Sequence, residues 1–172
     1  MRWAGTGYRA HHPRWAWSPL SGEGAALKGG RFNPRGVPAL YLALSVEGMF
    51  CEMGHGFAHV FEPLTVCSYT VDMEDVADLR TDAAREESGI TLDDMAIGWE
   101  YELSCGRRPA SWSVHDSLVG RGIAGILVPS FARGARDHMY NLVLWRWSDA
   151  LPHKIEVHDP SGRLPRGGAS WG

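Results

Sequence analysis

Three residues within a short stretch of the chain have side chains that could act together on a charged nucleotide. Arg31 lies in GGRFNPRG, Tyr41 in VPALYLAL and Glu52 in SVEGMFCE. Arginine presents a planar fork that suits a pyrophosphate, and an aromatic ring can stack on a flat cationic ring. A carboxylate can accept a hydrogen bond from a ribose hydroxyl and stabilise an oxocarbenium-like cation. Together these groups fit NAD⁺.

Each of the three residues also has a purely structural explanation that the sequence pattern leaves open. Arg31 could form a surface ion pair, Tyr41 could pack in the core, and Glu52 could be a solvated helix residue. A metal site would use Glu52 with His55 and His59 at helical spacing, but no second group of ligands follows that spacing. We therefore expect no metal.

Other catalytic motifs do not match. GEGAALKGG lacks the GxxxxGK[ST] pattern of a P-loop, and no GxGxxG follows a strand. A serine nucleophile in a GxSxG turn is also missing from the sequence.

The segments around the three residues predict a loop, a strand and a helix in succession. Residues 18–36 are rich in glycine and proline, which predicts an irregular loop without a helix. Residues 37–44 alternate as a half-buried strand, with the leucines in the core and Tyr41 on the opposite face. Ser45 can cap a helix whose apolar stripe should pack onto the sheet. The helix must fold back on its own strand, so the three side chains can meet in one pocket. The expected stripe consists of Val46, Met49, Phe50, Met53, Phe57 and Val60.

The remaining periodicity predicts an α+β fold with a mixed, mostly antiparallel β core and flanking helices. Strands are expected at 64–73, 123–130, 139–147 and 153–158, a short extended piece at 76–80, and helices at 83–97 and 110–122. Because the strands are mostly sequential, a doubly wound parallel sheet is disfavoured. We expect one domain over residues 1–158 and a Gly/Pro-rich mobile tail over residues 159–172.

Composition excludes several other classes of protein. The chain has 172 residues, 44% of them hydrophobic, a net charge of -3 and a pI of about 6.2. The basic surface of a nucleic-acid binder is missing, and no apolar run reaches the length of a membrane span. The three cysteines lack CxxC spacing, so we expect reduced thiols in a cytoplasmic protein.

Several motifs resemble the RES-domain family, toxins of bacterial toxin-antitoxin modules named for an arginine, a glutamate and a serine. The matching pieces are GYR at 7–9, GGRFNPRGVPALYLALS at 29–45, Glu52, VADLR at 76–80, GIAGILVPS at 122–130 and NLVLW at 141–145. Phe32 stands where the family usually has tryptophan, which keeps an aromatic ring at this position. The long GGR segment carries most of the resemblance.

The resemblance implies a RES-type catalytic domain with a fold related to ADP-ribosyltransferases, NAD⁺ as the substrate, and cleavage between nicotinamide and ribose. Arg31 and Arg9 would then hold the phosphates, and Tyr41 would stack on nicotinamide. Glu52 would bind the ribose 2′-hydroxyl as positive charge develops on the sugar. Ser130 would hydrogen-bond either the glutamate or the substrate. Asn141 would orient the pocket or serve only as a polar residue beside a strand edge.

The resemblance also implies a partner, a small helix-turn-helix antitoxin of the Xre type. The acceptor of ADP-ribose stays open: water would define an NAD⁺ glycohydrolase, phosphate a phosphorylase, and a side chain of a target protein an ADP-ribosyltransferase. A non-catalytic nucleotide-binding module with the same fold is the alternative. Tryptophans near the N-terminus, including Trp3, Trp15 and Trp17, predict either a partner interface or a larger core.

Overall fold

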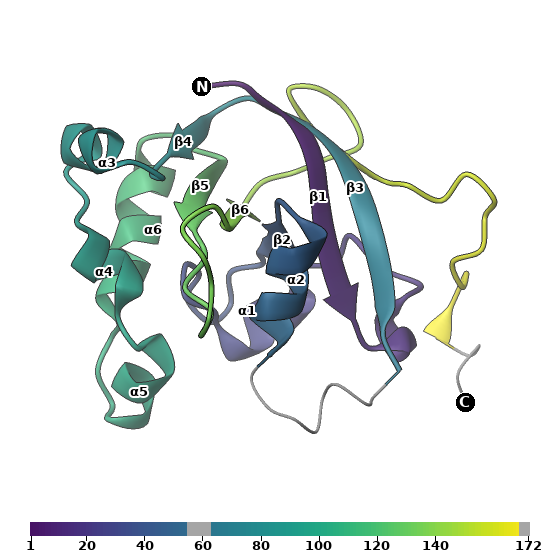
Figure 1. The fold of residues 1–172 in the computed structure, drawn as a ribbon, viewed down its shortest axis with the longest axis horizontal. Coiled ribbons are helices and arrows are strands. Elements are labelled where there is room, and N and C mark those ends of the chain that lie inside the picture. Colours follow the sequence, from purple (N-terminus) through teal and green to yellow (C-terminus); the bar gives the residue numbers. More distant parts are fainter. Residues whose placement is uncertain (55–62, 169–172) are drawn as a thin grey trace.

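The computed structural model describes residues 1–54 and 63–168. Within them, seven strands form one curled sheet in the order β4-β5-β6-β2-β1-β3-β7 (Figure 1). The strands are β1 (Trp3–His11), β2 (Leu40–Ala43), β3 (Thr65–Met73), β4 (Val76–Asp78), β5 (Gly125–Pro129), β6 (Tyr140–Leu144) and β7 (His153–Val157). Among the described strands only β4 and β5 pair in parallel, so the predicted α+β fold with a mostly antiparallel sheet is confirmed.

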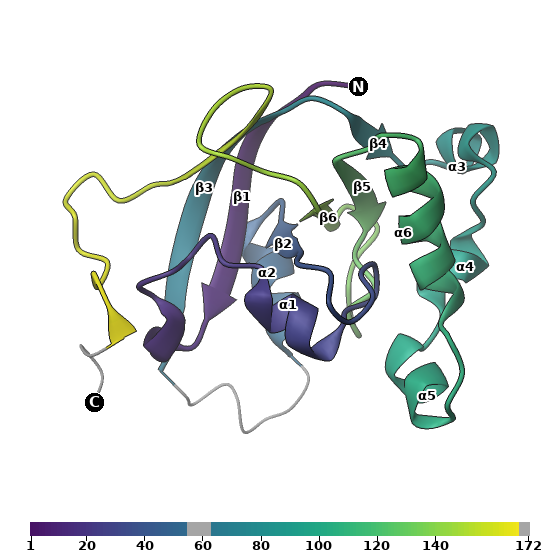
Figure 2. The ribbon, with the colours of Figure 1, turned by 180° about the vertical axis from the view of Figure 1, so that it is seen from behind.

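Six α-helices and one short 3-10 turn accompany the sheet in the described residues. They are η1 (Pro13–Trp15), α1 (Glu23–Lys28), α2 (Val46–Met53), α3 (Asp82–Ser88), α4 (Leu92–Ala96), α5 (Trp99–Ser104) and α6 (Ala110–Gly120). Helices α3 to α6 gather beside β4 and β5, whereas α2 and α1 lie on opposite faces of the sheet around β2 (Figures 1 and 2). No helix in the described ranges is long and apolar enough to cross a bilayer.

The two faces of the sheet bury separate cores because successive strand residues point to opposite sides. On one face, Leu40 and Leu42 of β2 belong to a core that also contains residues of β3, such as Tyr69. Val143 and Ile126 face the other way and pack with residues of α6 such as Leu118. The predicted separation of the β2 leucines from Tyr41 is therefore confirmed.

Helix α2 begins as predicted but is shorter than its sequence pattern indicates. The Ser45 Oγ accepts a hydrogen bond from the Gly48 backbone N–H at 3.0 Å, and the helix ends at Met53. Met49 is buried, but Val46 and Phe50 are 45% and 56% exposed, so the prediction of one continuous buried stripe is wrong. Phe57 and Val60 lie outside the described residues. Only one side of this short helix contacts the sheet.

Two other sequence predictions need correction. The loop predicted over residues 18–36 contains α1, because the alanines and the leucine between Gly22 and Gly29 favour a helix. The helix predicted over residues 83–97 is two helices, α3 and α4. Gly89 ends α3 with a φ of 69°, and Thr91 caps α4.

Strand β1 was not predicted. Its sequence contains Gly5 and Gly7, which weaken an alternating pattern. Nine residue pairs join β1 to β3 and stabilise it. A Cβ at Gly7 would lie 2.9 Å from the Leu42 side chain, so glycine permits the close approach of β1 to β2.

Candidate active site

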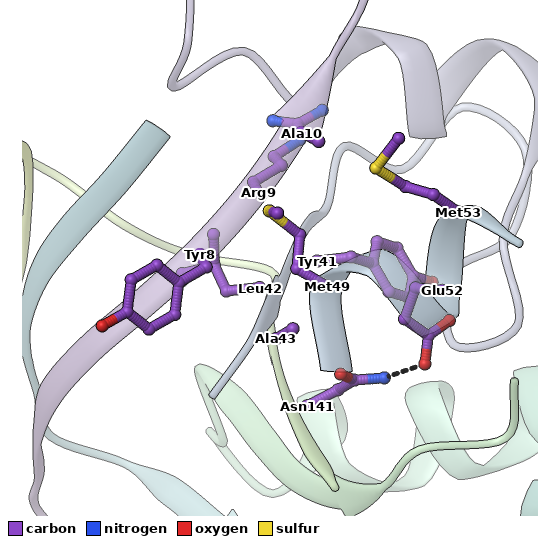
Figure 3. A pocket seen from close by; sticks show the side chains of 10 residues that line it. All are labelled: Tyr8, Arg9, Ala10, Tyr41, Leu42, Ala43, Met49, Glu52, Met53 and Asn141. Carbon is purple, nitrogen blue, oxygen red and sulfur yellow. Dashed lines mark hydrogen bonds between the residues drawn. The ribbon is translucent and has the colours of Figure 1, made fainter. Parts of the chain in front are cut away.

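A cleft lies where β1 and β2 diverge. In the described structure these strands share a single register pair, Tyr8 with Ala43. The cleft, here called the β1–α2 pocket, has a volume of about 280 Å³ and is lined by residues of β1, β2 and α2, together with Asn141 of β6 (Figure 3). The divergence of two neighbouring strands therefore opens the sheet next to the α2 carboxylate.

A second, larger pocket adjoins the first. It has a volume of about 510 Å³ and is lined by the loop that carries Arg31, by residues of α5, and by Phe131; it is here called the Arg31 pocket. Tyr41, Glu52 and Asn141 line both pockets. These three side chains thus form the boundary between two cavities that one elongated ligand could occupy.

The Glu52 carboxylate is held by two donors from distant strands. Its Oε1 accepts a hydrogen bond from the Ser130 Oγ at 2.5 Å. It accepts another from the Asn141 Nδ2 at 2.6 Å (Figure 3). Among the described residues, none donates to Oε2. The carboxylate is therefore fixed through one oxygen and open through the other. Of the two partners that the sequence analysis gives Ser130, this structure shows the glutamate.

Tyr41 is oriented through its hydroxyl group. The Tyr41 hydroxyl donates to the Asn33 Oδ1 at 2.7 Å and accepts from the Phe32 backbone N–H at 3.0 Å. Burial raises the pKa of Tyr41, so the phenol stays protonated at neutral pH and donates this hydrogen bond. A Cβ at Gly30 would lie 2.5 Å from both oxygens, so the second glycine of GGR leaves space for the contact.

The loop that carries Arg31 is anchored by buried polar groups. Asn33 is fully buried, and its Nδ2 donates to the carbonyls of Ala25 and Val37, each at 2.9 Å. The indole N–H groups of Trp112 and Trp145 donate to the carbonyls of residues 30 and 32, each at 2.8 Å. These bonds hold a glycine-rich segment in one conformation.

The Arg31 side chain extends from this loop to the end of α4. Its Nη1 donates to the backbone carbonyls of Met95 at 3.0 Å and Ile97 at 2.5 Å, and its guanidinium lies 4.9 Å from the centre of the Phe131 ring. Burial lowers the pKa of Arg31, while the negative charge of Glu52 opposes that shift. The guanidinium's other N–H groups have no partner in the described part of the chain, so they can meet a ligand.

Arg9 lies at the other end of the β1–α2 pocket. Its Nη1 donates to the carbonyls of Pro19 at 3.3 Å and Ser21 at 3.1 Å, and burial lowers its pKa. In Figure 3 its guanidinium extends away from Glu52. The structure thus places Glu52, Tyr41, Ser130 and Asn141 together, with Arg31 and Arg9 at separate ends of the two pockets.

Several residues around the pockets were not singled out in the sequence. Asn33 belongs to the quoted GGRFNP motif, but nothing local indicates that its amide would bond Tyr41. Phe131 and the α5 residue Glu100 line the Arg31 pocket through long-range packing. The sequence offered one signal for Asn33: it lies in a segment that begins with two glycines and continues with a proline, where an asparagine often fixes the conformation of a loop.

The alternative metal site would combine Glu52 with two histidines from the segment that follows α2. His55 and His59 lie outside the described residues. Within residues 1–54 and 63–168 there is no group of three His, Cys, Asp or Glu side chains suited to a metal ion.

The curled, mostly antiparallel sheet has an ADP-ribosyltransferase-like fold. The family model described as the RES domain matches residues 6–167, and the chain belongs to this family. It is 34% identical over 143 residues to proteins named NAD(+) phosphorylase MbcT of Mycobacterium tuberculosis and Mycobacterium bovis, with 76% of this chain and 69% of the relatives covered.

A solved structure shows the same fold. The crystal structure of the M. tuberculosis MbcT-MbcA toxin-antitoxin complex matches with a TM-score of 0.65 and 27% sequence identity. The match covers 92% of this chain and 84% of the other. This similarity confirms the ADP-ribosyltransferase-like fold that the RES resemblance implied.

Proposed function

We propose that this chain consumes NAD⁺ by breaking the bond between nicotinamide and ribose and transferring ADP-ribose to phosphate. The observation that carries the proposal is the Glu52 carboxylate, fixed through Oε1 by Ser130 and Asn141 and open through Oε2 at the junction of two pockets. The similarity to proteins named NAD(+) phosphorylase supports phosphate as the acceptor.

In the proposed reaction, Glu52 stabilises the positive charge that develops on the ribose. Nicotinamide leaves with the electron pair of the glycosidic bond, and positive charge develops on the ribose carbon and its ring oxygen. The Glu52 Oε2 accepts a hydrogen bond from the 2′-hydroxyl, and the negative charge stabilises the neighbouring cation. A phosphate oxygen then forms the new bond, giving nicotinamide and ADP-ribose 1″-phosphate.

Tyr41 and the two arginines bind the two substrates around the reacting ribose carbon. The Tyr41 ring stacks on nicotinamide, because it borders both pockets and its hydroxyl is fixed by Asn33. Arg9 attracts the pyrophosphate at one end of the site, and Arg31, at the other end, attracts the phosphate that accepts ADP-ribose. Since the Nη1 atoms of both arginines already bond backbone carbonyls, these cations are held in place before substrate binds.

Purified protein is expected to release nicotinamide from NAD⁺, and release should increase when phosphate is supplied. Chromatography and ³¹P NMR should identify ADP-ribose 1″-phosphate as the second product, and EDTA should leave the rate unchanged because no metal is assigned. Free ADP-ribose at equal rates with and without phosphate would identify water as the acceptor. Transfer of label from labelled NAD⁺ to a protein in a cell lysate would identify a protein side chain as the acceptor. NAD⁺ that stays intact under all three conditions would contradict the enzymatic proposal.

We also propose that the chain is a toxin neutralised by a cognate helix-turn-helix antitoxin. Its structural match is to the toxin-antitoxin complex named above, and its family resemblance implies such a partner. Expression in bacteria should deplete cellular NAD⁺ and arrest growth, and co-expression of the antitoxin should restore both. A Glu52→Gln variant should be harmless if NAD⁺ loss causes the arrest. Equal growth arrest by this variant, at the same protein level, would show that toxicity has another cause.

A further inference from the structure

A third pocket lies at the end of β1, where the chain leaves the sheet. It has a volume of about 160 Å³, and the side chains that define it include Arg9, His11, Trp15, Trp17, Ser21 and Glu23; it is here called the tryptophan pocket. Arg9 also lines the β1–α2 pocket. The tryptophan pocket therefore continues the series of cavities that begins at Arg31 and passes Glu52.

Two indole rings at this pocket are open to solvent. Trp15 is 58% exposed and Trp17 is 42% exposed, although tryptophan carries a large apolar surface. A flat aromatic surface is the usual platform for a nucleic-acid base, because every base has a π face that stacks without a sequence requirement. The exposed aromatic surface at this pocket therefore suits a planar heterocycle.

The segment that carries the tryptophans is held in place by hydrogen bonds. Trp15 closes the η1 turn through a bond from its N–H to the His12 carbonyl at 2.9 Å, and the Ser18 N–H donates to the Trp15 carbonyl at 3.0 Å. The Tyr69 hydroxyl donates to the Pro19 carbonyl at 3.0 Å, and Arg9 donates to the same carbonyl. The segment is thus tied to β1 and β3, so little ordering is needed when a ligand stacks on it.

The charges around this pocket favour a base over a phosphate group. Burial and the neighbouring Arg9 charge lower the pKa of His11 to about 4, so its ring is neutral at pH 7. Glu23 contributes a carboxylate, which repels a phosphate but accepts a hydrogen bond from an exocyclic amine. Among the described residues, Arg9 is the one arginine that lines this pocket, and it also lines the β1–α2 pocket.

We propose that the tryptophan pocket binds the adenine base of NAD⁺, stacked on Trp15 or Trp17, with Arg9 beside the phosphate that follows the adenosine. This inference rests on the proposed function for the identity of the substrate. It assigns the three pockets in order: nicotinamide and the reacting ribose lie near Tyr41 and Glu52, the pyrophosphate near Arg9, and adenine beyond it.

The test measures binding of the two halves of the substrate separately. By isothermal titration calorimetry, the protein should bind AMP and nicotinamide mononucleotide. Combined Trp15→Ala and Trp17→Ala substitutions should weaken AMP binding by about tenfold or more, as loss of a base-stacking surface does elsewhere. Binding of nicotinamide mononucleotide should change by less than about twofold. In turnover assays the KM for NAD⁺ should rise about tenfold with kcat nearly unchanged, because the lost contact is the same in the ground and transition states.

Matched variants separate stacking from a general loss of structure. Trp15→Phe with Trp17→Phe should retain most of the AMP affinity, and Phe50→Ala removes an equally exposed aromatic ring outside the three pockets. Unchanged AMP binding in the double alanine variant overturns the inference, and so does a loss of antitoxin binding alone. Because AMP has no nicotinamide to release, its binding can be measured whether or not the protein cleaves NAD⁺. Tryptophan-dependent AMP binding by a protein that releases no nicotinamide would support the pocket and reject the proposed reaction.

Discussion

Glu52→Gln is expected to lower the turnover of NAD⁺ by at least about a hundredfold while the protein stays folded. The glutamine Oε1 can still accept hydrogen bonds from Ser130 and Asn141, so the free energy of unfolding should change by no more than about 1 kcal/mol. The substitution removes the negative charge that opposes the forming cation, and it puts a donor where the ribose hydroxyl needs an acceptor. Loss of one preorganised electrostatic group typically costs about a hundredfold to a thousandfold in rate.

The measurement compares kcat with NAD⁺ affinity in the same variant. NAD⁺ affinity should fall far less than kcat, because the full charge on the sugar exists only as the bond breaks. Ser130→Ala, which removes one of two donors to Oε1, should lower kcat by about tenfold and serves as a graded comparison. A folded Glu52→Gln protein that keeps more than about a tenth of the turnover would exclude Glu52. Glu100, which lines the Arg31 pocket, would then be the next candidate. Glu47 is disfavoured because it lies 3.6 Å from Arg136 and is exposed.

Asn33→Ala should lower the free energy of unfolding by about 3–5 kcal/mol. The part-buried Val37 carbonyl would lose its donor, the Ala25 carbonyl would keep only the Gly29 N–H, and the Tyr41 hydroxyl would lose its acceptor. Each buried polar group left without a partner costs about 1–3 kcal/mol. For a chain of this length we expect the thermal midpoint to fall by about 10 °C. Urea titration and thermal melting measure the two quantities.

Tyr41→Phe is the control for Asn33→Ala because it removes the hydroxyl, with its bonds to the Asn33 Oδ1 and from the Phe32 N–H, but leaves the Asn33 amide in place. Loss of these two bonds should cost about 2 kcal/mol and keep the loop in place, since Asn33 retains its bonds to the two carbonyls. If Asn33→Ala were no more destabilising than Tyr41→Phe, the bonds from its Nδ2 would contribute little. The GGRFNP segment would then be held mainly by the indole N–H groups of Trp112 and Trp145.

The sequence predicted the local elements around the candidate site because their signals are local. Alternation in residues 37–44 separated Tyr41 from the buried leucines, and Ser45 indicated the start of α2 through its capping hydroxyl. The antiparallel α+β architecture also followed from the order of strand patterns. The length of α2 was less predictable, because its apolar residues exceed those that one side of the helix can bury.

Only the tertiary structure brought the site together. Ser130 and Asn141 reach Glu52 across 78 and 89 residues of sequence, and Arg31 reaches the Met95 carbonyl across 64. No local pattern encodes such pairs, because they depend on the order of strands in the sheet. Strand β1, with Arg9, exists through its pairing with β3, and its divergence from β2 opens the β1–α2 pocket. Local periodicity therefore determined which residues could act, whereas sheet topology decided which of them meet.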